Sequence, residues 1–176
     1  MDRRNFIKLS ALITGIGFSD QIISSVWRDC LAATPNEEKH FFTMNKWQLV
    51  NELADTILPR TETPGAKDIG VTDFIDRLLA FHAYPEEQNS FQEGLQSMEK
   101  DCIKRNGKPF ISCKNAERED FISHQEKISG QFPASHWGMP VEVLPTPETY
   151  RVLKGMVIQA YFNSHKIAEL LKYGNS

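Results

Sequence analysis

The side chains that most often carry out chemistry in proteins are few in this chain and widely spaced. The five histidines are His40, His82, His124, His136 and His165. No two of them have the separation that would place a pair of metal ligands on one turn of a helix. The sequence also lacks the haem-attachment motif CxxCH, a CxxC pair, the zinc motif HExxH and the nucleophile elbow GxSxG. We therefore expect no catalytic residue, no metal and no cofactor in this chain.

The cysteines offer one further kind of chemistry, a disulfide bond. There are three of them, Cys30, Cys102 and Cys113, which is too few for a disulfide-based scaffold. If Cys30 leaves with an N-terminal signal, Cys102 and Cys113 remain, and an oxidising compartment would let them bond to each other. Two unpaired thiols, or a bond from either cysteine to another chain, are the alternatives that the sequence leaves open.

Carboxylates can act as acid–base pairs, but their positions here favour structural roles. Asp73 and Asp76 fall near the start of an expected helix, where the helix dipole stabilises negative charge. Asp55 lies late in an expected helix, just before a loop with several prolines and glycines. We expect Asp55 to accept hydrogen bonds from backbone amides of that loop, without any part in catalysis.

The first residues of the chain carry the most informative pattern. Two arginines are followed by one free position, a phenylalanine, an aliphatic residue and a lysine: Arg3, Arg4, Phe6, Ile7 and Lys8. This pattern before a short apolar run is typical of a twin-arginine export signal. Such a signal is read by the twin-arginine translocase, which carries folded proteins across the bacterial inner membrane. We therefore expect a periplasmic protein, associated with the inner membrane, if at all, through a complex.

The apolar run from residue 9 to residue 19 is too short for a membrane-spanning helix, which needs about 20 apolar residues. We expect it to be the apolar part of the signal, with cleavage after Ala33 in an imperfect site, although a retained anchor is conceivable. The chain then divides into a signal segment (1–33), a polar linker (34–43) and one helical domain (44–176). A formal net charge of −3 gives no reason to expect binding to nucleic acid or to an acidic membrane surface.

Apolar residues recur at helical spacing in several segments of the domain. The first helix is expected over residues 44–58, with Thr43 as its cap. The second begins at Val71-Thr72, with Thr72 as its cap and His82 on its apolar face as a structural histidine. The third begins at Pro85, a favoured first helical residue, and ends at Asn106-Gly107.

Three further helices are expected in the rest of the domain. A weaker helix is expected over about 114–128, and residues 130–145 are expected to be irregular. Thr146-Pro147-Glu148 has the composition of a helix start, and Ser164 is expected to cap a last short helix. No segment alternates with period two for long enough to predict a strand. The sequence therefore predicts an all-α fold, a single small domain of about five to six helices joined by long Pro/Gly-rich connections.

A loop with two prolines and two glycines joins the first two helices, over residues 59–70. This loop and the helix end before it, Leu53–Ala66, resemble the signature LADTILPxTxTPGA of the gluconate 2-dehydrogenase subunit 3 family. The resemblance continues through Asp68, Gly70-Val71 and Phe74-Ile75-Asp76, and more loosely through residues 161–164 and Tyr173. It therefore extends over nearly the whole chain after the signal. The family commonly continues past the final tyrosine with a tail that has a late cysteine, so contacts of that tail are not carried over.

The resemblance implies a non-catalytic small subunit of a membrane-associated sugar or polyol dehydrogenase. In such complexes the large subunit is a flavin-dependent enzyme of the glucose–methanol–choline type, so FAD belongs to the partner, and a cytochrome c subunit often accepts the electrons. The large subunit often lacks a signal and is exported bound to the small one. On this reading the chain escorts, exports and stabilises its partner.

We expect the Pro/Gly loop and its apolar neighbours to contact the partner, since a stiff loop loses little entropy on binding. The expected contact residues are Leu58, Pro59, Thr61, Thr63, Pro64, Gly65, Ala66, Gly70, Val71, Phe74 and Ile75. The alternatives are a purely structural loop, with the contact surface on residues 130–147, a free-standing periplasmic binding module, or a small exported hydrolase. The substrate, the oxidised position and the electron acceptor would be properties of the partner.

Overall fold

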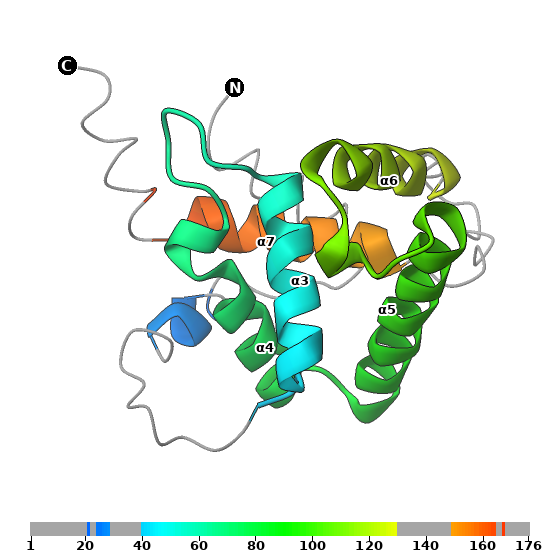
Figure 1. Ribbon diagram of the computed structural model, residues 1–176. Helices are drawn as coiled ribbons and strands as arrows, with labels where there is room; N and C mark the ends of the chain where they lie inside the picture. The colour runs from blue at the N-terminus through cyan, green and yellow to red at the C-terminus, as the bar shows by residue number, and fades with distance from the viewer. Residues whose placement is uncertain (1–20, 22–23, 29–39, 130–148, 165–166, 168–176) are drawn as a thin grey trace, which may run out of the picture.

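The fold is all-α, as the sequence predicts. In the computed structural model we describe residues 21, 24–28, 40–129, 149–164 and 167, and within them there are helices and turns but no strand. The elements in chain order are α3 (Met44–Ile57), the short 3₁₀-helix η1 (Lys67–Ile69), α4 (Val71–His82), α5 (Pro85–Asn106), the 3₁₀-helix η2 (Phe110–Ser112), α6 (Asn115–Ile128) and α7 (Thr149–Asn163) (Figure 1). The export motif, Ala33, Cys30, residues 130–148 and Tyr173 lie outside the described residues. Within the described ranges, no helix is long and apolar enough to cross a membrane.

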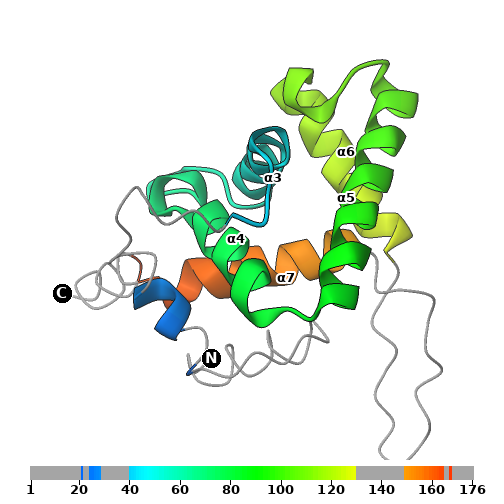
Figure 2. The same cartoon turned by 90° about the horizontal axis from the view of Figure 1, so that it is seen from below.

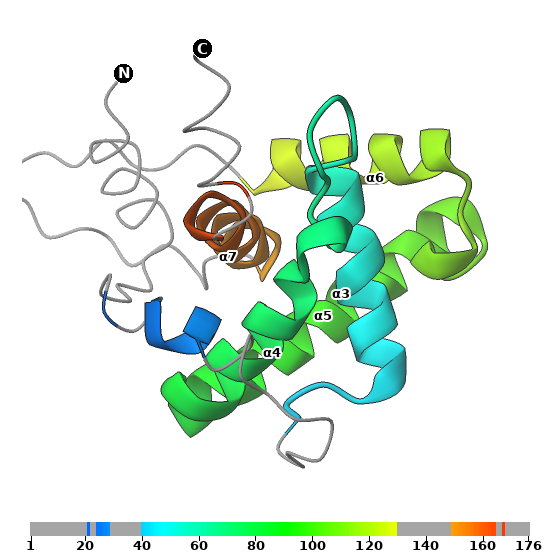
Figure 3. The same ribbon diagram turned by 90° about the vertical axis from the view of Figure 1, so that its left-hand side faces the viewer.

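Helix α7 is the central element of the domain. It contacts α3, α4, α5 and α6. Figure 2 shows α4 and α5 crossing it at separate points along its length, and Figure 3 looks along its axis. Nine of its residues are buried, which is more than the single stripe of a surface helix. They are Tyr150, Val152, Leu153, Gly155, Met156, Val157, Gln159, Ala160 and Tyr161.

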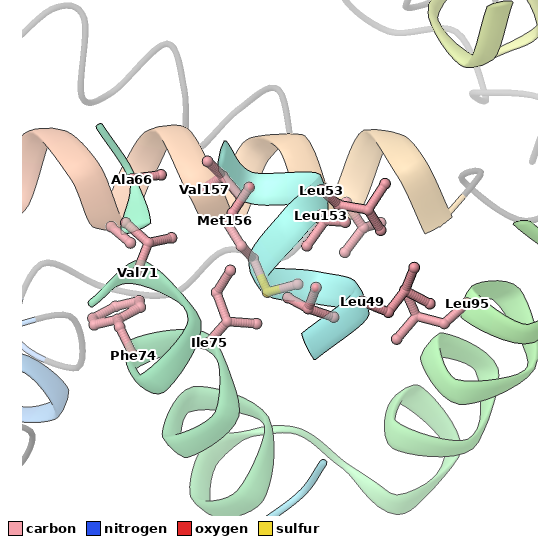
Figure 4. Packing of buried hydrophobic residues seen from close by; sticks show 14 of the residues in the cluster. Leu49, Leu53, Ala66, Val71, Phe74, Ile75, Leu95, Leu153, Met156 and Val157 are labelled. Carbon is pink, nitrogen blue, oxygen red and sulfur yellow. The ribbon is translucent and has the colours of Figure 1, made fainter. Parts of the chain in front are cut away.

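The core lies where α3, α4 and α5 meet α7. Figure 4 shows Leu49 and Leu53 of α3, Ile75 of α4, Leu95 of α5 and Leu153 of α7 in the space between these helices. All five side chains are 3% exposed or less. Burial of apolar surface of this extent is the main stabilising contribution to a small helical domain.

A glycine lets α5 approach the start of α7 closely. A Cβ at Gly94 would overlap the side chain of Thr149, the first residue of α7. A larger residue at Gly94 would therefore require Thr149 or one of the two helices to shift. The periodicity of α5 in the sequence does not indicate this, because Gly94 simply reads as a weak position in a helix.

The helix ends agree with the sequence in most places and differ in two caps. Pro85 begins α5 and Gly107, with φ of 70°, ends it, as predicted. Gly70, with φ of 77°, precedes α4 as its N-cap, whereas Thr72 is buried inside the helix and donates a hydrogen bond to Asn51. Thr43 occupies the N-cap position of α3, but its side chain makes no cap hydrogen bond. A threonine can satisfy a tertiary partner instead of a helix end, and local pattern does not distinguish the two.

Two further expectations are corrected by the structure. His82 is exposed at the end of α4 and is not a core histidine. Asp76, expected to serve only the helix dipole, is buried and holds the chain that precedes α3. Its carboxylate accepts a hydrogen bond from the backbone N of Phe42 at 2.7 Å, and its other oxygen lies 3.0 Å from Nδ1 of His40. The last residues of the expected linker are thus fixed to the domain.

Candidate partner interface

The connection between α3 and α4, residues 58–70, is held in one shape by its own backbone. The amide of Ala66 donates to the carbonyl of Leu58 at 2.9 Å, which closes the base of the loop. The amide of Thr61 donates to the carbonyl of Thr63 at 3.1 Å, which turns the tip. The 3₁₀-helix η1 follows within the segment that the sequence predicts to be only a loop. The chain then passes through Gly70 into α4.

Gly65 permits a close approach of the two sides of this loop. It is buried, and a Cβ at this position would lie 2.7 Å from the backbone N of Arg60 and 3.1 Å from the carbonyl of Leu58. Both neighbours are backbone atoms, so they cannot rotate away as a flexible side chain would. The amide of Gly65 donates to a carboxylate oxygen of Asp68 at 2.8 Å. The role that we expected of Asp55, binding the loop's amides, is therefore performed by Asp68.

Helix α7 fixes the loop from the other end of the sequence. The hydroxyl of Tyr161 donates to the carbonyl of Pro64 at 2.7 Å, and it lies 3.4 Å from Oγ1 of Thr63. Tyr161 is 8% exposed, so this contact lies at the edge of the core. The second and looser block of the family resemblance thus packs against the first one.

A charged network holds the loop to α3 and α6. Nζ of Lys67 lies 2.6 Å from one oxygen of Glu52 and 3.6 Å from a carboxylate oxygen of Asp55, and Arg118 of α6 binds the other oxygen of Glu52. Partial burial on its own would raise the pKa of Glu52, but the hydrogen bonds and positive charges of Lys67 and Arg118 outweigh that effect and lower it. Glu52 is therefore held in its charged form by its two partners.

The exposed part of the loop is its tip. Pro59, Thr61 and Thr63 are exposed, and Leu58, Pro64 and Gly70 are half-buried. The other expected contact residues are inside the domain: Gly65 is buried, and Ala66, Val71, Phe74 and Ile75 are completely buried. Val71 and Phe74 face the core from the first turn of α4 (Figure 4). Of the expected contact residues, a partner can reach only those of the tip and the half-buried flanks in this conformation. The others pack inside the domain and are not exposed.

The two cysteines for which the sequence leaves a mutual disulfide open are brought together at the corner between α5 and α6. Sγ of Cys102 in α5 lies 3.9 Å from Sγ of Cys113, which follows η2, and both are free, buried thiols. The side-chain amide of Asn106 lies 3.6 Å from each sulfur. Burial raises the pKa of the Cys102 thiol to about 11. Both sulfurs are therefore placed for a bond to each other, while a disulfide with a separate chain would require the corner to open.

Two exposed aromatic residues near the α4–α5 turn were not among the expected contact residues. Phe81 is 53% exposed and Tyr84 is 72% exposed. Phe81 is seven residues after Phe74 and so continues the apolar stripe of α4 at its edge, which is why its spacing in the sequence does not distinguish it from a core residue. No group of histidine, cysteine and carboxylate side chains within the described ranges has the arrangement of a metal site.

Comparison with known proteins places the chain in a family. The model of the family described as gluconate 2-dehydrogenase subunit 3 matches residues 34–175. Searches of curated proteins and of solved structures gave no match. The matched range contains the α3–α4 loop, its contacts from α6 and α7, and the two neighbouring thiols of Cys102 and Cys113. Because the match extends over most of the sequence, the chain belongs to the gluconate 2-dehydrogenase subunit 3 family.

Proposed function

We propose that this chain is a non-catalytic small subunit that escorts, exports and stabilises a flavin-dependent large subunit of the glucose–methanol–choline type. The large subunit carries FAD and oxidises a sugar, polyol or glycoside in the periplasm. The observation that carries the proposal is the family match over residues 34–175, since the family is one of dehydrogenase subunits. The Arg3-Arg4 pattern supports the export role, because the twin-arginine route accepts proteins that fold before transport.

The α3–α4 loop is the proposed contact with the large subunit. Its tip is exposed, whereas its base is fixed by Tyr161 and by the Glu52–Lys67 pair. A loop that is already ordered loses less conformational entropy on binding than a flexible one. The polar tip and half-buried flanks suit the rim and the outer core of a protein interface.

Export is tested in cells that produce this chain together with the proposed flavoprotein partner. Changing Arg3 and Arg4 together to Lys is expected to leave both proteins in the cytoplasm. Asn5→Gln, at the free position of the motif, is the matched control and should leave export normal. The measurement is the amount of each protein in periplasmic and cytoplasmic fractions. Normal periplasmic yield of both chains from the double variant would contradict the proposal.

The division of chemistry between subunits is tested on purified proteins. The isolated small subunit is expected to have no dehydrogenase activity and no flavin or haem absorption band after gel filtration. The complex should show both activity and a flavin band. Turnover by the small subunit alone would favour the exported-hydrolase or another enzymatic reading. A stable monomer that does not bind the flavoprotein would favour a free-standing binding module.

A further inference from the structure

A short segment upstream of the family match is packed into the core. Residues 24–28 are helical and lie beside α4 in all three views (Figures 1–3), while the family match begins only at residue 34. Val26 is 1% exposed and belongs to the same buried cluster as the residues of α3, α4 and α7. A signal segment that is removed after export would not be expected to contribute a buried side chain to the core of the domain.

The neighbouring tryptophan covers one end of α4. The ring of Trp27 lies 4.9 Å, centroid to centroid, from the ring of Phe74, with the planes inclined by 33°. Phe74 is completely buried in the presence of this segment. Aromatic pairs at this separation add a stabilising contribution beyond the area that they bury. Nε1 of Trp27 has no hydrogen-bond partner among the described residues, so apolar contact is what holds the ring.

Cleavage after Ala33 would remove both Val26 and Trp27. It would take away the aromatic neighbour of Phe74 and one side chain of the core itself. Exposing that much apolar surface on a small domain is unfavourable. We propose that residues 24–28 are a permanent part of the folded domain, docked on α4 through Val26 and Trp27, and that the exported protein keeps them. The docking on α4 is independent of the proposed function, whereas retention in the exported protein rests on it.

The docking is tested on the full-length chain, independently of export. Trp27→Ala is expected to lower the melting temperature by roughly 5 °C or more, because a half-buried aromatic contact is lost. Trp27→Phe retains a ring and should recover most of that loss. Ser24→Ala, at an exposed position of the same segment, is the matched control and should change little. Equal melting temperatures for Trp27→Ala and Ser24→Ala would overturn the docking.

A double-mutant cycle identifies the contact itself. Trp27→Ala and Phe74→Leu should be non-additive, because each removes one partner of the same ring pair. Strictly additive shifts in melting temperature would mean that Trp27 does not contact Phe74, and would overturn the proposal. If Trp27→Ala does not yield folded protein, the cycle is run with Trp27→Leu.

Retention is tested on the protein recovered from the periplasm. Intact mass and N-terminal peptide mapping are expected to show a chain that begins before residue 24, whether or not part of the signal has been removed. A periplasmic chain that begins after Trp27, including one that begins at Thr34 with Phe74 covered by the partner, would overturn retention. Failure of export would contradict the proposed function. The docking of residues 24–28 on α4 would then be decided by the melting temperatures and the double-mutant cycle alone.

Discussion

The α3–α4 loop and the α5–α6 corner contain similar structural elements, but different contacts stabilise them. The α3–α4 loop and the α5–α6 corner each contain a 3₁₀ turn and a glycine with positive φ, Gly70 and Gly107. The first is fixed from far away: Tyr161, which reaches Pro64, is 97 residues distant in the sequence. The second is fixed locally, since Cys102 and Cys113 are 11 residues apart. The α3–α4 loop therefore has a contact that only the complete fold provides, whereas the two thiols of the corner are brought together by a short stretch of chain.

The two connections are also linked to each other. Arg118 donates hydrogen bonds to the carbonyls of Phe110 and Ile111 in the corner, and its guanidinium also binds Glu52, the partner of Lys67. A structural change in the corner that moves Arg118 would therefore also affect Glu52 and Lys67 at the base of the loop. The following predictions test whether the corner serves stability while the loop serves binding.

The largest effect is expected from oxidising the corner. In a Cys30→Ser background, oxidised glutathione should convert the two thiols to a disulfide, with two electrons and two protons passing to form two reduced glutathiones. Closing a loop of this length should raise the free energy of unfolding by roughly 3 kcal/mol or less. The measurement is chemical denaturation of both forms, with intact mass to confirm the loss of two hydrogens. A mixed disulfide with glutathione that persists, or no oxidation of the folded protein, would contradict the pairing.

The reduced corner should also weaken at alkaline pH. The pKa of the Cys102 thiol is raised by burial to about 11, so the folded state favours the protonated form. The stability that this provides is complete below the unfolded pKa, near 9, and is lost as the pH rises toward 11. The disulfide form cannot titrate at this site and should lose less stability over that range. Tyr150, whose pKa is also raised by burial, contributes an alkaline loss to both forms. Parallel stability–pH curves for the two forms would contradict this account.

The next effect separates a steric glycine from a conformational one. Gly65→Ala should lower the free energy of unfolding by about 2 kcal/mol, because its Cβ would meet backbone atoms on the other side of the loop. Gly107→Ala has open space around it and should cost only about 1 kcal/mol for its left-handed conformation. Chemical denaturation measures both. A larger loss at Gly107 would mean that the loop can open without much cost and is not rigid.

Sequence reasoning located the helices well because their stripes, prolines and terminal glycines are local signals. The end of α3 and both ends of α5 follow directly from Pro59, Pro85 and Gly107. The role of Phe74 could not be read in the same way. Its spacing marks it as apolar and facing one side, but only the packing of Trp27 and α7 decides that the chain covers that side itself.

The candidate site was predicted only in part for the same reason. The exposed tip at Pro59, Thr61 and Thr63 agrees with a loop that a partner can reach. The contacts that shape it come from Tyr161 and Arg118, at sequence separations that no local pattern encodes. Asp68 and Asp55 are both acids beside the same loop, and only their geometry shows which one binds the amide of Gly65.

A smaller effect is expected from the charge that joins the two connections. Glu52→Gln should cost about 1 kcal/mol, since the network is only partly buried and Arg118 keeps its backbone partners. Because the partners of Glu52 lower its pKa, the wild type should lose this stability as the pH falls through the folded pKa, below the ordinary value of 4.5. The variant should lack that part of the acid sensitivity. Identical acid unfolding of both proteins would show that the network does not stabilise the loop.

The smallest effect on stability, and the most selective effect on binding, is expected at the tip. Thr61→Ala with Glu62→Ala removes two exposed side chains and should change the free energy of unfolding by no more than about 0.5 kcal/mol. Binding to the proposed flavoprotein partner, measured by calorimetry on purified proteins, should nevertheless weaken about tenfold, or roughly 1.4 kcal/mol. The matched control is Glu119→Ala with Ser123→Ala, which removes exposed side chains from α6 and should change neither quantity. If the tip variant binds as tightly as the wild type, the loop is only a structural connection and the contact surface lies elsewhere, with the exposed aromatics Phe81 and Tyr84 the next residues to change. If instead the tip variant loses stability as well, the separation between a binding loop and a stabilising corner fails, because the tip would then be contributing to the fold that presents it.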